Sequence, residues 1–361
     1  MNKTIKEQNM KALADYNRQL WEKPKLKYLF FELTDKCNLC CQHCGSQCNS
    51  ANNTFLPLNI IEETLYKVYS AYGTKDIMIC ITGGEPLLHP DLYDVIRMAK
   101  DMGFAVGMTT NGTLINKRNT LMLGKSGLDT VAISIDGLSE THDLFRSSLG
   151  SFNKAIIGAA NLREVGIEPQ VITVVHKNNF DELEDMYEEF SRQGFYSWRL
   201  VSVDPIGRAK INKKILLEPK DLKALYDFIK EKRYAENAEM EVTYGCSHFL
   251  TMDYENELRD YYFQCGAGIF VASVMANGDI GSCLDIERRP ELIQGNVYKD
   301  DFIDVWENKF SEFRKDRVCD SEFCRRCVHS SICMGDSFHT WDFENRKPLY
   351  CVAEMFKEIT L

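Results

Sequence analysis

The sequence predicts an α/β protein: a partial (β/α)6 TIM-like barrel followed by a small, irregular, cysteine-rich C-terminal domain. Short β-rich runs alternate with segments of helical spacing, and runs such as 130–135 are apolar without alternation, as in parallel strands buried on both faces. Residues 25–235 are too few for a full eight-unit barrel, which takes about 250 residues. Beyond about residue 236 the pattern breaks into short pieces that hold eight of the 14 cysteines.

The elements follow in chain order. Residues 1–24 have the pattern of an amphipathic helix, and we expect this N-terminal helical extension to cap the barrel. The clearest helix of the barrel domain, 25–235, is predicted over 180–193, where apolar residues recur at i, i+3, i+4 and i+7. The C-terminal domain, 236–361, has one good helix at about 301–314. Six strands are predicted at 28–33, 77–81, 105–109, 130–135, 170–175 and 198–203.

The composition excludes several classes of protein. The net charge of −10 argues against a nucleic-acid backbone as the main partner. No apolar run approaches the roughly 18 residues that a membrane-spanning helix needs, and residues 1–20 lack the apolar core of a secretion signal. The 14 cysteines are too sparse for a disulfide scaffold, so in a reducing compartment they are expected to bind metal or do redox chemistry. We therefore expect a cytoplasmic protein that binds neither membrane nor nucleic acid.

Five cysteines lie close together after the first predicted strand, and three of them have a Cys-x3-Cys-x2-Cys spacing, namely Cys37, Cys41 and Cys44. Three thiolates in one short loop can bind one corner of an iron–sulfur cluster. The fourth iron then has no protein ligand and stays open to an exogenous one. An open coordination position distinguishes catalytic from structural zinc sites in the same way. A zinc knuckle or a set of buried free thiols is the alternative.

The ends of the next strands carry short polar and glycine-rich segments. The second strand is followed by Thr82-Gly83-Gly84-Glu85-Pro86, the third by Thr110-Asn111-Gly112 and the fourth by Asp136-Gly137. In barrels of this kind the chemistry lies at the carboxyl ends of the strands, which is where these segments fall.

In spacing, order and strand position, these motifs resemble the radical S-adenosylmethionine (radical SAM) superfamily over about residues 25–235. The resemblance implies a [4Fe–4S] cluster with an open iron, held by Cys37, Cys41 and Cys44, and it implies S-adenosylmethionine (SAM) bound to that iron. Gly83, Gly84 and Glu85 would hold the SAM amino group. The other implied SAM contacts are Asn111, Ser134 and Arg146 near the ribose and carboxylate, and His43 near the adenine. Cys40 does not fit the pattern and is interpreted as structural.

The cysteines of the last third resemble the SPASM extension of many radical SAM enzymes, over about residues 240–355. This implies one or two auxiliary iron–sulfur clusters. The distal cluster would be bound by Cys324, Cys327, Cys333 and Cys351. The near cluster would take Cys265 and Cys283, but Ser337 stands where the family pattern has another cysteine. We expect Cys246 and Cys319 to complete the near cluster. One alternative is a single auxiliary cluster with spare thiols, and a second alternative is two structural zinc sites.

The resemblance also implies a function. The enzyme would generate a 5′-deoxyadenosyl radical and oxidatively modify a peptide or protein, with an electron donor such as flavodoxin or ferredoxin as a partner. A separate peptide-binding protein is a further expected partner, because only about 25 residues precede the first strand. Asp285 is the candidate base, with a turn residue as its alternative role. Arg208, after the sixth strand, is assigned to a substrate carboxylate or to the barrel rim.

Two other functions stay open. The first is small-molecule chemistry of the porphyrin type in haem pathways, where some relatives also have a histidine before the third cysteine, as His43 is here. The second is an iron–sulfur electron-transfer protein without SAM chemistry. The formation of 5′-deoxyadenosine under reducing, oxygen-free conditions separates the last possibility from the other two.

Overall fold

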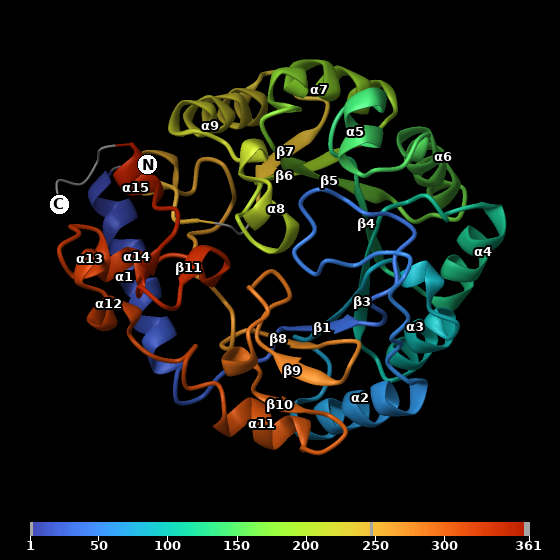
Figure 1. Ribbon diagram of the computed structural model, residues 1–361, viewed down its shortest axis with the longest axis horizontal. Coiled ribbons are helices and arrows are strands. Elements are labelled where there is room, and N and C mark those ends of the chain that lie inside the picture. Colours follow the sequence, from blue (N-terminus) through green and yellow to red (C-terminus); the bar gives the residue numbers. More distant parts are fainter. Residues whose placement is uncertain (1–2, 246–247, 357–361) are drawn as a thin grey trace.

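One curved sheet organises the computed structural model, which describes residues 3–245 and 248–356 (Figure 1). In that part of the chain the sheet has ten strands in the order β10-β9-β8-β1-β2-β3-β4-β5-β6-β7. Strands β1 to β7 are parallel and follow chain order, β8 adds to β1 in parallel, and β9 and β10 are antiparallel. The strands are β1 Tyr28–Glu32, β2 Met78–Thr82, β3 Ala105–Thr110, β4 Thr130–Ser134, β5 Pro169–Val175, β6 Ser197–Ser202, β7 Glu241–Tyr244, β8 Val271–Val274, β9 Asp279–Gly281 and β10 Gly295–Asn296.

Helices connect the parallel strands and cover the outside of the curved sheet (Figure 1). Helix α3 shows why they dock there, because Leu92, Val95, Ile96 and Ala99 form one buried apolar face at helical spacing. The helices of this half are α1 Lys3–Gln19, α2 Leu58–Tyr72, α3 Leu92–Asp101, α4 Lys117–Ser126, α5 Ser139–Phe145, α6 Ser151–Arg163, α7 Leu183–Arg192, α8 Gly207–Ile211 and α9 Pro219–Tyr234.

The partial barrel predicted from the sequence is confirmed, and its six strands lie within a residue or two of the predicted ranges. Strands β7 and β8 were not predicted, and they extend the sheet at both sides by pairing with β6 and β1. The sheet therefore runs past residue 235, and the predicted division at 235/236 stays a prediction. None of the described helices is long and apolar enough to cross a membrane.

Helix α1 forms as predicted but packs elsewhere than expected. Its main packing partners are α10 (Thr251–Tyr254) and α14 (Ser330–Cys333), so it lies along the C-terminal region and does not cap the barrel. The reason is its buried face, where Met10 joins an apolar cluster with Phe249, Met252 and Ile332.

The C-terminal region consists of short elements that lie with α1 where the sheet stays open, between β7 and β10 (Figure 1). The helix predicted at about 301–314 ends earlier, at Asn308, because the chain then turns Phe310 and Phe313 into the core. The remaining helices are α11 Phe302–Asn308, α12 Arg317–Asp320, α13 Glu322–Arg325 and α15 Val352–Met355, and a small hairpin pairs β11 Trp341–Asp342 with β12 Lys347–Pro348.

Candidate functional site

The loop after β1 brings the three predicted cluster thiols together at the carboxyl ends of the strands. Cys37, Cys41 and Cys44 pack in one small cluster with Leu39 and Cys48. Burial raises the pKa of the Cys37 thiol to about 12 and that of the Cys41 thiol to about 11. A hydrogen bond from Cys48 lowers the pKa of Cys44. Cys40, by contrast, is exposed, which agrees with its exclusion from the cluster set.

Two buried side chains direct N–H groups at these sulfurs. Asn111 Nδ2 lies 3.9 Å from Cys37 Sγ, and Arg146 Nη1 lies 3.9 Å from Cys41 Sγ. Arg146 also donates to the buried carboxylate of Asp136, at 2.9 Å from Nε and 2.6 Å from Nη2. Burial alone would raise the pKa of Asp136, but Arg146, two nearby histidines and the Val174 N–H together outweigh burial, so the pKa is lowered. Three thiols with N–H donors beside them suit an iron–sulfur cluster, whose potential depends on such contacts.

The Gly83-Gly84 turn after β2 docks on the segment that leads into Cys37. The Gly84 N–H donates to the Thr34 carbonyl at 2.6 Å, and the Glu85 N–H donates to the Lys36 carbonyl at 2.9 Å. A Cβ atom at Gly84 would lie 2.2 Å from the Lys36 carbonyl oxygen. The approach of the two backbones therefore requires glycine here.

Glu85 is fully buried, and its carboxylate is engaged within the protein. It accepts hydrogen bonds from the Thr110 hydroxyl at 2.7 Å and from the Asn111 N–H at 2.9 Å. Burial raises the pKa of this carboxyl in spite of those bonds. Glu85 thus ties the turn after β2 to the end of β3. Its contact with the SAM amino group stays a prediction.

His43 lies at one end of a stack of three rings. Its ring stacks on Phe145 with centroids 4.7 Å apart, and Phe145 stacks on His176 at 3.6 Å. Burial lowers the pKa of His43 to about 4. Its Nδ1 is buried and has no hydrogen-bond partner among residues 3–245 and 248–356, so a polar atom there is left for a ligand. Ser134 ends β4 and is half-buried.

Arg208, for which the sequence left two roles open, holds the cysteine loop. Its Nε donates to the Cys41 carbonyl at 2.6 Å, its Nη2 donates to the Cys48 carbonyl at 3.1 Å, and its own N–H donates to the Cys44 carbonyl at 3.1 Å. The preceding Gly207 has φ +51°, and a Cβ there would lie 2.3 Å from the Cys44 carbonyl oxygen. In the sequence, the Gly207-Arg208 pair after the sixth strand is the feature that could have indicated this contact with the cysteine loop.

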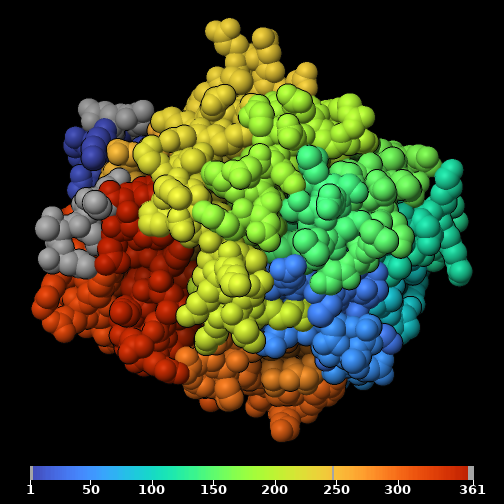
Figure 2. Space-filling model, turned by 45° about the horizontal axis from the view of Figure 1, so that its top comes forward, coloured from blue at the N-terminus to red at the C-terminus, as the bar shows by residue number. Residues whose placement is uncertain are grey.

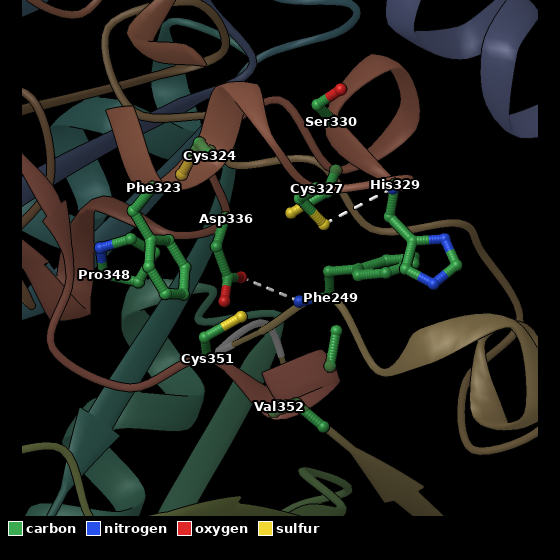
Figure 3. A pocket seen from close by; sticks show the side chains of 13 residues that line it. Phe249, Phe323, Cys324, Cys327, His329, Ser330, Asp336, Pro348, Cys351 and Val352 are labelled. Atoms are coloured by element: carbon green, nitrogen blue, oxygen red, sulfur yellow. Dashed lines mark hydrogen bonds between the residues drawn. The ribbon is translucent and has the colours of Figure 1, made fainter. Parts of the chain in front are cut away.

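The four cysteines predicted for the distal cluster line one pocket (Figure 3). They come from α13, α14, the loop between these helices and the start of α15, and they are Cys324, Cys327, Cys333 and Cys351. The His329 N–H lies 3.4 Å from Cys327 Sγ, and burial raises the pKa of Cys333 well above its usual value. Phe249, Phe323 and Pro348 supply an apolar lining. Four thiols around one apolar pocket are a donor set that fits an iron–sulfur cluster.

Around Cys283, one of the cysteines predicted for the near cluster, the structure brings together three side chains of different chemistry. Cys283 Sγ lies at hydrogen-bond distance, 3.7 Å, from His339 Nε2. One potential ligand atom from each of Cys283, Asp285 and His339 lies within 4.8 Å of the other two. Cys319 is exposed on α12 beside Asp316 and Asp320. Cys246 lies outside the described residues, so the four-thiol near cluster, with Cys265, stays a prediction. His339 was missed by the sequence reasoning, although it stands two residues after the anomalous Ser337.

Comparison with sequence families gives two matches. Residues 31–190 match the Radical SAM superfamily, and residues 265–328 match SPASM, an iron–sulfur cluster-binding domain.

The proteins that are similar over most of the chain include two enzymes of known name and a solved structure. The AdoMet-dependent heme synthase of Oleidesulfovibrio alaskensis is 25% identical over 86% of this chain and 82% of its own. The mycofactocin maturase MftC of Mycobacterium tuberculosis is 30% identical over 85% of this chain and 77% of its own. Streptococcus suis SuiB, in a crystal structure bound to precursor peptide SuiA, has a TM-score of 0.74 at 20% identity, covering 94% of this chain and 78% of that one. This last likeness is one of fold.

Proposed function

Because this chain belongs to the radical SAM superfamily and carries a SPASM domain, it is an enzyme with iron–sulfur clusters and SAM as cofactors, and we propose that it oxidatively modifies a peptide or protein substrate. When bound, the cluster and SAM supply a 5′-deoxyadenosyl radical that takes a hydrogen atom from an unactivated C–H bond. A flavodoxin or ferredoxin is the expected electron donor.

The observation that carries the substrate class is the 30% identity with a mycofactocin maturase over 85% of this chain. The fold shared with SuiB, whose structure holds a precursor peptide, supports the same class. A peptide side chain would have to reach the carboxyl ends of β1 to β4, where the cysteine loop, the glycine turn, Asn111 and Arg146 meet.

Within this proposal the residues of the site have separate tasks. Cys37, Cys41 and Cys44 hold the cluster, while the N–H groups of Asn111 and Arg146 offset the negative charge of thiolates. The backbone of Gly83 and Gly84 is the surface on which the SAM amino group would rest. The close approach of both glycines to residues 34–36 holds this backbone in place. The stacked ring of His43 keeps water from one side of the adenine position.

The segment around α8 protects this site. It lies at the surface between the blue part of the chain, before residue 60, and the red C-terminal region (Figure 2). Its Arg208 and Gly207 contact the backbone of the cysteine loop. A fixed cover of this kind limits the access of solvent to a reactive radical.

Neighbouring cysteines provide a matched test of the cluster assignment. We expect Cys41→Ser to lose the iron of the first cluster and all 5′-deoxyadenosine formation under reducing, oxygen-free conditions. Cys40→Ser should keep both, because Cys40 is exposed whereas Cys41 is buried with the other thiols. Retention of iron and deoxyadenosine formation in Cys41→Ser would contradict the assignment.

A porphyrin-type substrate is the second candidate, favoured by the similarity to the AdoMet-dependent heme synthase of O. alaskensis. The purified enzyme is offered, in parallel, a porphyrin with propionate side chains and the peptides encoded by short reading frames next to its gene. We expect one of the peptides to raise 5′-deoxyadenosine formation and to lose hydrogen by mass spectrometry. Turnover of the porphyrin with every peptide inert would replace the peptide proposal by the porphyrin one.

A further inference from the structure

Three potential metal ligands of different chemistry meet after β9, outside the two cysteine groups described above. Cys283 follows β9, Asp285 lies two residues further on, and His339 comes from a short 3-10 turn at Phe338–Thr340. The ligand atoms of these three side chains lie within 4.8 Å of one another. The fold thus brings together side chains from segments more than 50 residues apart in the sequence.

The two strongest ligands lie within hydrogen-bond reach of each other, and their distance also fits two ligands of a single ion. A tetrahedral zinc ion, with Zn–S of about 2.3 Å and Zn–N of about 2.0 Å, separates its sulfur and nitrogen ligands by about 3.5 Å. The observed distance from Cys283 Sγ to His339 Nε2 is 3.7 Å. Ligands on different irons of a four-iron cluster stand on different corners of a larger body, so they lie further apart.

A carboxylate behind His339 is the second, independent observation. Asp204 Oδ2 lies 3.7 Å from His339 Nδ1, the ring nitrogen that faces away from Cys283. The His339 side chain is only 8% exposed. Metal-binding histidines regularly present their second nitrogen to a carboxylate, which fixes the ring and raises its basicity. The backbone is fixed as well, since the His339 N–H donates to the Ser337 hydroxyl at 3.0 Å.

We propose that Cys283, Asp285 and His339 bind a single divalent metal ion, with Zn²⁺ as the ion that this sulfur, oxygen and nitrogen set suits best, where a four-thiolate near cluster was expected. Ser337, the position at which the family pattern has a cysteine, then supports the histidine that replaces it. The site does not depend on the substrate class proposed above. It does exclude the predicted base role of Asp285, because a carboxylate bound to a metal is not free to take a proton.

Metal content is the direct test, measured on the full chain purified without oxygen after reconstitution with iron and sulfide and addition of one equivalent of Zn²⁺. We expect about eight irons per chain, for two four-iron clusters, and one zinc. Cys283→Ala and His339→Ala should lose the zinc and keep the iron, while His339→Cys should retain zinc. The matched control is His89→Ala, which removes another buried histidine that bonds the Leu56 carbonyl instead. X-ray absorption at the zinc edge should show sulfur, nitrogen and oxygen ligands.

Two results would overturn the proposal. The first is about twelve irons per chain, of which about four are lost in Cys283→Ala. The second is zinc that stays bound in His339→Ala. Asp285→Asn separates the two roles of that residue: we expect weaker zinc binding, whereas full zinc binding with loss of product would restore the base assignment and remove Asp285 from the ligand set.

Discussion

A single arginine fixes the geometry of the cysteine loop. Arg208 reaches the carbonyls of Cys41 and Cys48 with two different nitrogens of one planar guanidinium group. Lysine carries one compact ammonium group and cannot hold both carbonyls in this way. The residue therefore positions the loop and is not expected to touch the reacting atoms.

We expect Arg208→Lys to weaken retention of the first cluster without preventing its assembly. Freshly reconstituted protein should hold normal iron, but its visible absorbance should decay several-fold faster in air or in the presence of a chelator. Arg192→Lys, on the exposed surface of α7, is the matched control and should decay at the normal rate. An unchanged decay rate in Arg208→Lys would show that the loop keeps its shape without the arginine.

Gly84 is a second residue whose replacement has a direct steric consequence. A methyl group at this position would collide with the Lys36 carbonyl, a backbone atom that cannot move aside cheaply. We expect Gly84→Ala to displace the turn from the segment before Cys37 and to reduce SAM binding at least ten-fold, as measured by equilibrium dialysis. Gly166→Ala is the control: a Cβ there meets nothing within 4 Å, and the strain of alanine at its φ of +78° falls on the loop between α6 and β5, outside the cysteine loop. Equal SAM binding by both variants would contradict the assigned role of the turn.

At the scale of elements, the six predicted strands were recognisable as short β-rich runs, each followed by a segment of helical spacing. In the structure their side chains alternate between buried and partly buried positions, as β2 and β5 show. Strands β7 and β8 have four residues each and no distinctive pattern, so only their pairing with β6 and β1 defines them. The structure brings together the thiols of the first set, which was predicted from its spacing, and those of the distal set, which the resemblance implied; their roles as ligands stay predictions. The contacts of Arg208 and His339 could not be predicted from the sequence, because their partners are more than 50 residues away along the chain.

The position at which helix α1 packs was also not predicted from the sequence. Lys6 is the charged residue that it buries, and its Nζ donates to the Met252 carbonyl and to Glu257, both at 3.1 Å. Helix α1 packs against α14, which ends at Cys333 of the distal pocket. The N-terminal helix thus supports a wall of that pocket.

Removal of this anchor should loosen α1. We expect Lys6→Ala to cost about 1–3 kcal/mol, because it removes the donor to the Met252 carbonyl and one of the partners of Glu257. Limited proteolysis should cut α1 faster, and the distal cluster should lose iron sooner than in the parent. Lys11→Ala, whose side chain is exposed on the same helix, is the control. Equal cleavage of the two variants would mean that apolar packing around Met10 is sufficient.

At the scale of the whole molecule, buried polar groups connect the distal pocket with Cys283. Asp336 lines the pocket, and its carboxylate lies 3.8 Å from His248 Nδ1. His248 Nε2 lies 3.3 Å from Asp204, which in turn faces His339. The two regions are therefore in contact through fixed side chains, although the thiols of the first cluster belong to a separate loop. Loss of the distal cluster should affect the later steps of turnover more than the first one.

The double variant Cys324→Ala and Cys327→Ala tests this separation. It removes two of the four thiols that line the distal pocket and none of those in the loop after β1. We expect it to lose about four irons, to bind SAM normally and to form 5′-deoxyadenosine, but to yield much less product per deoxyadenosine. Iron analysis, chromatography of the nucleoside and mass spectrometry of the product give the three readouts, with Cys40→Ala as the control that should match the parent in all of them. If the double variant cannot cleave SAM while its first cluster is intact, the two regions work as one unit, because the reaction at the barrel mouth then depends on the distant thiols.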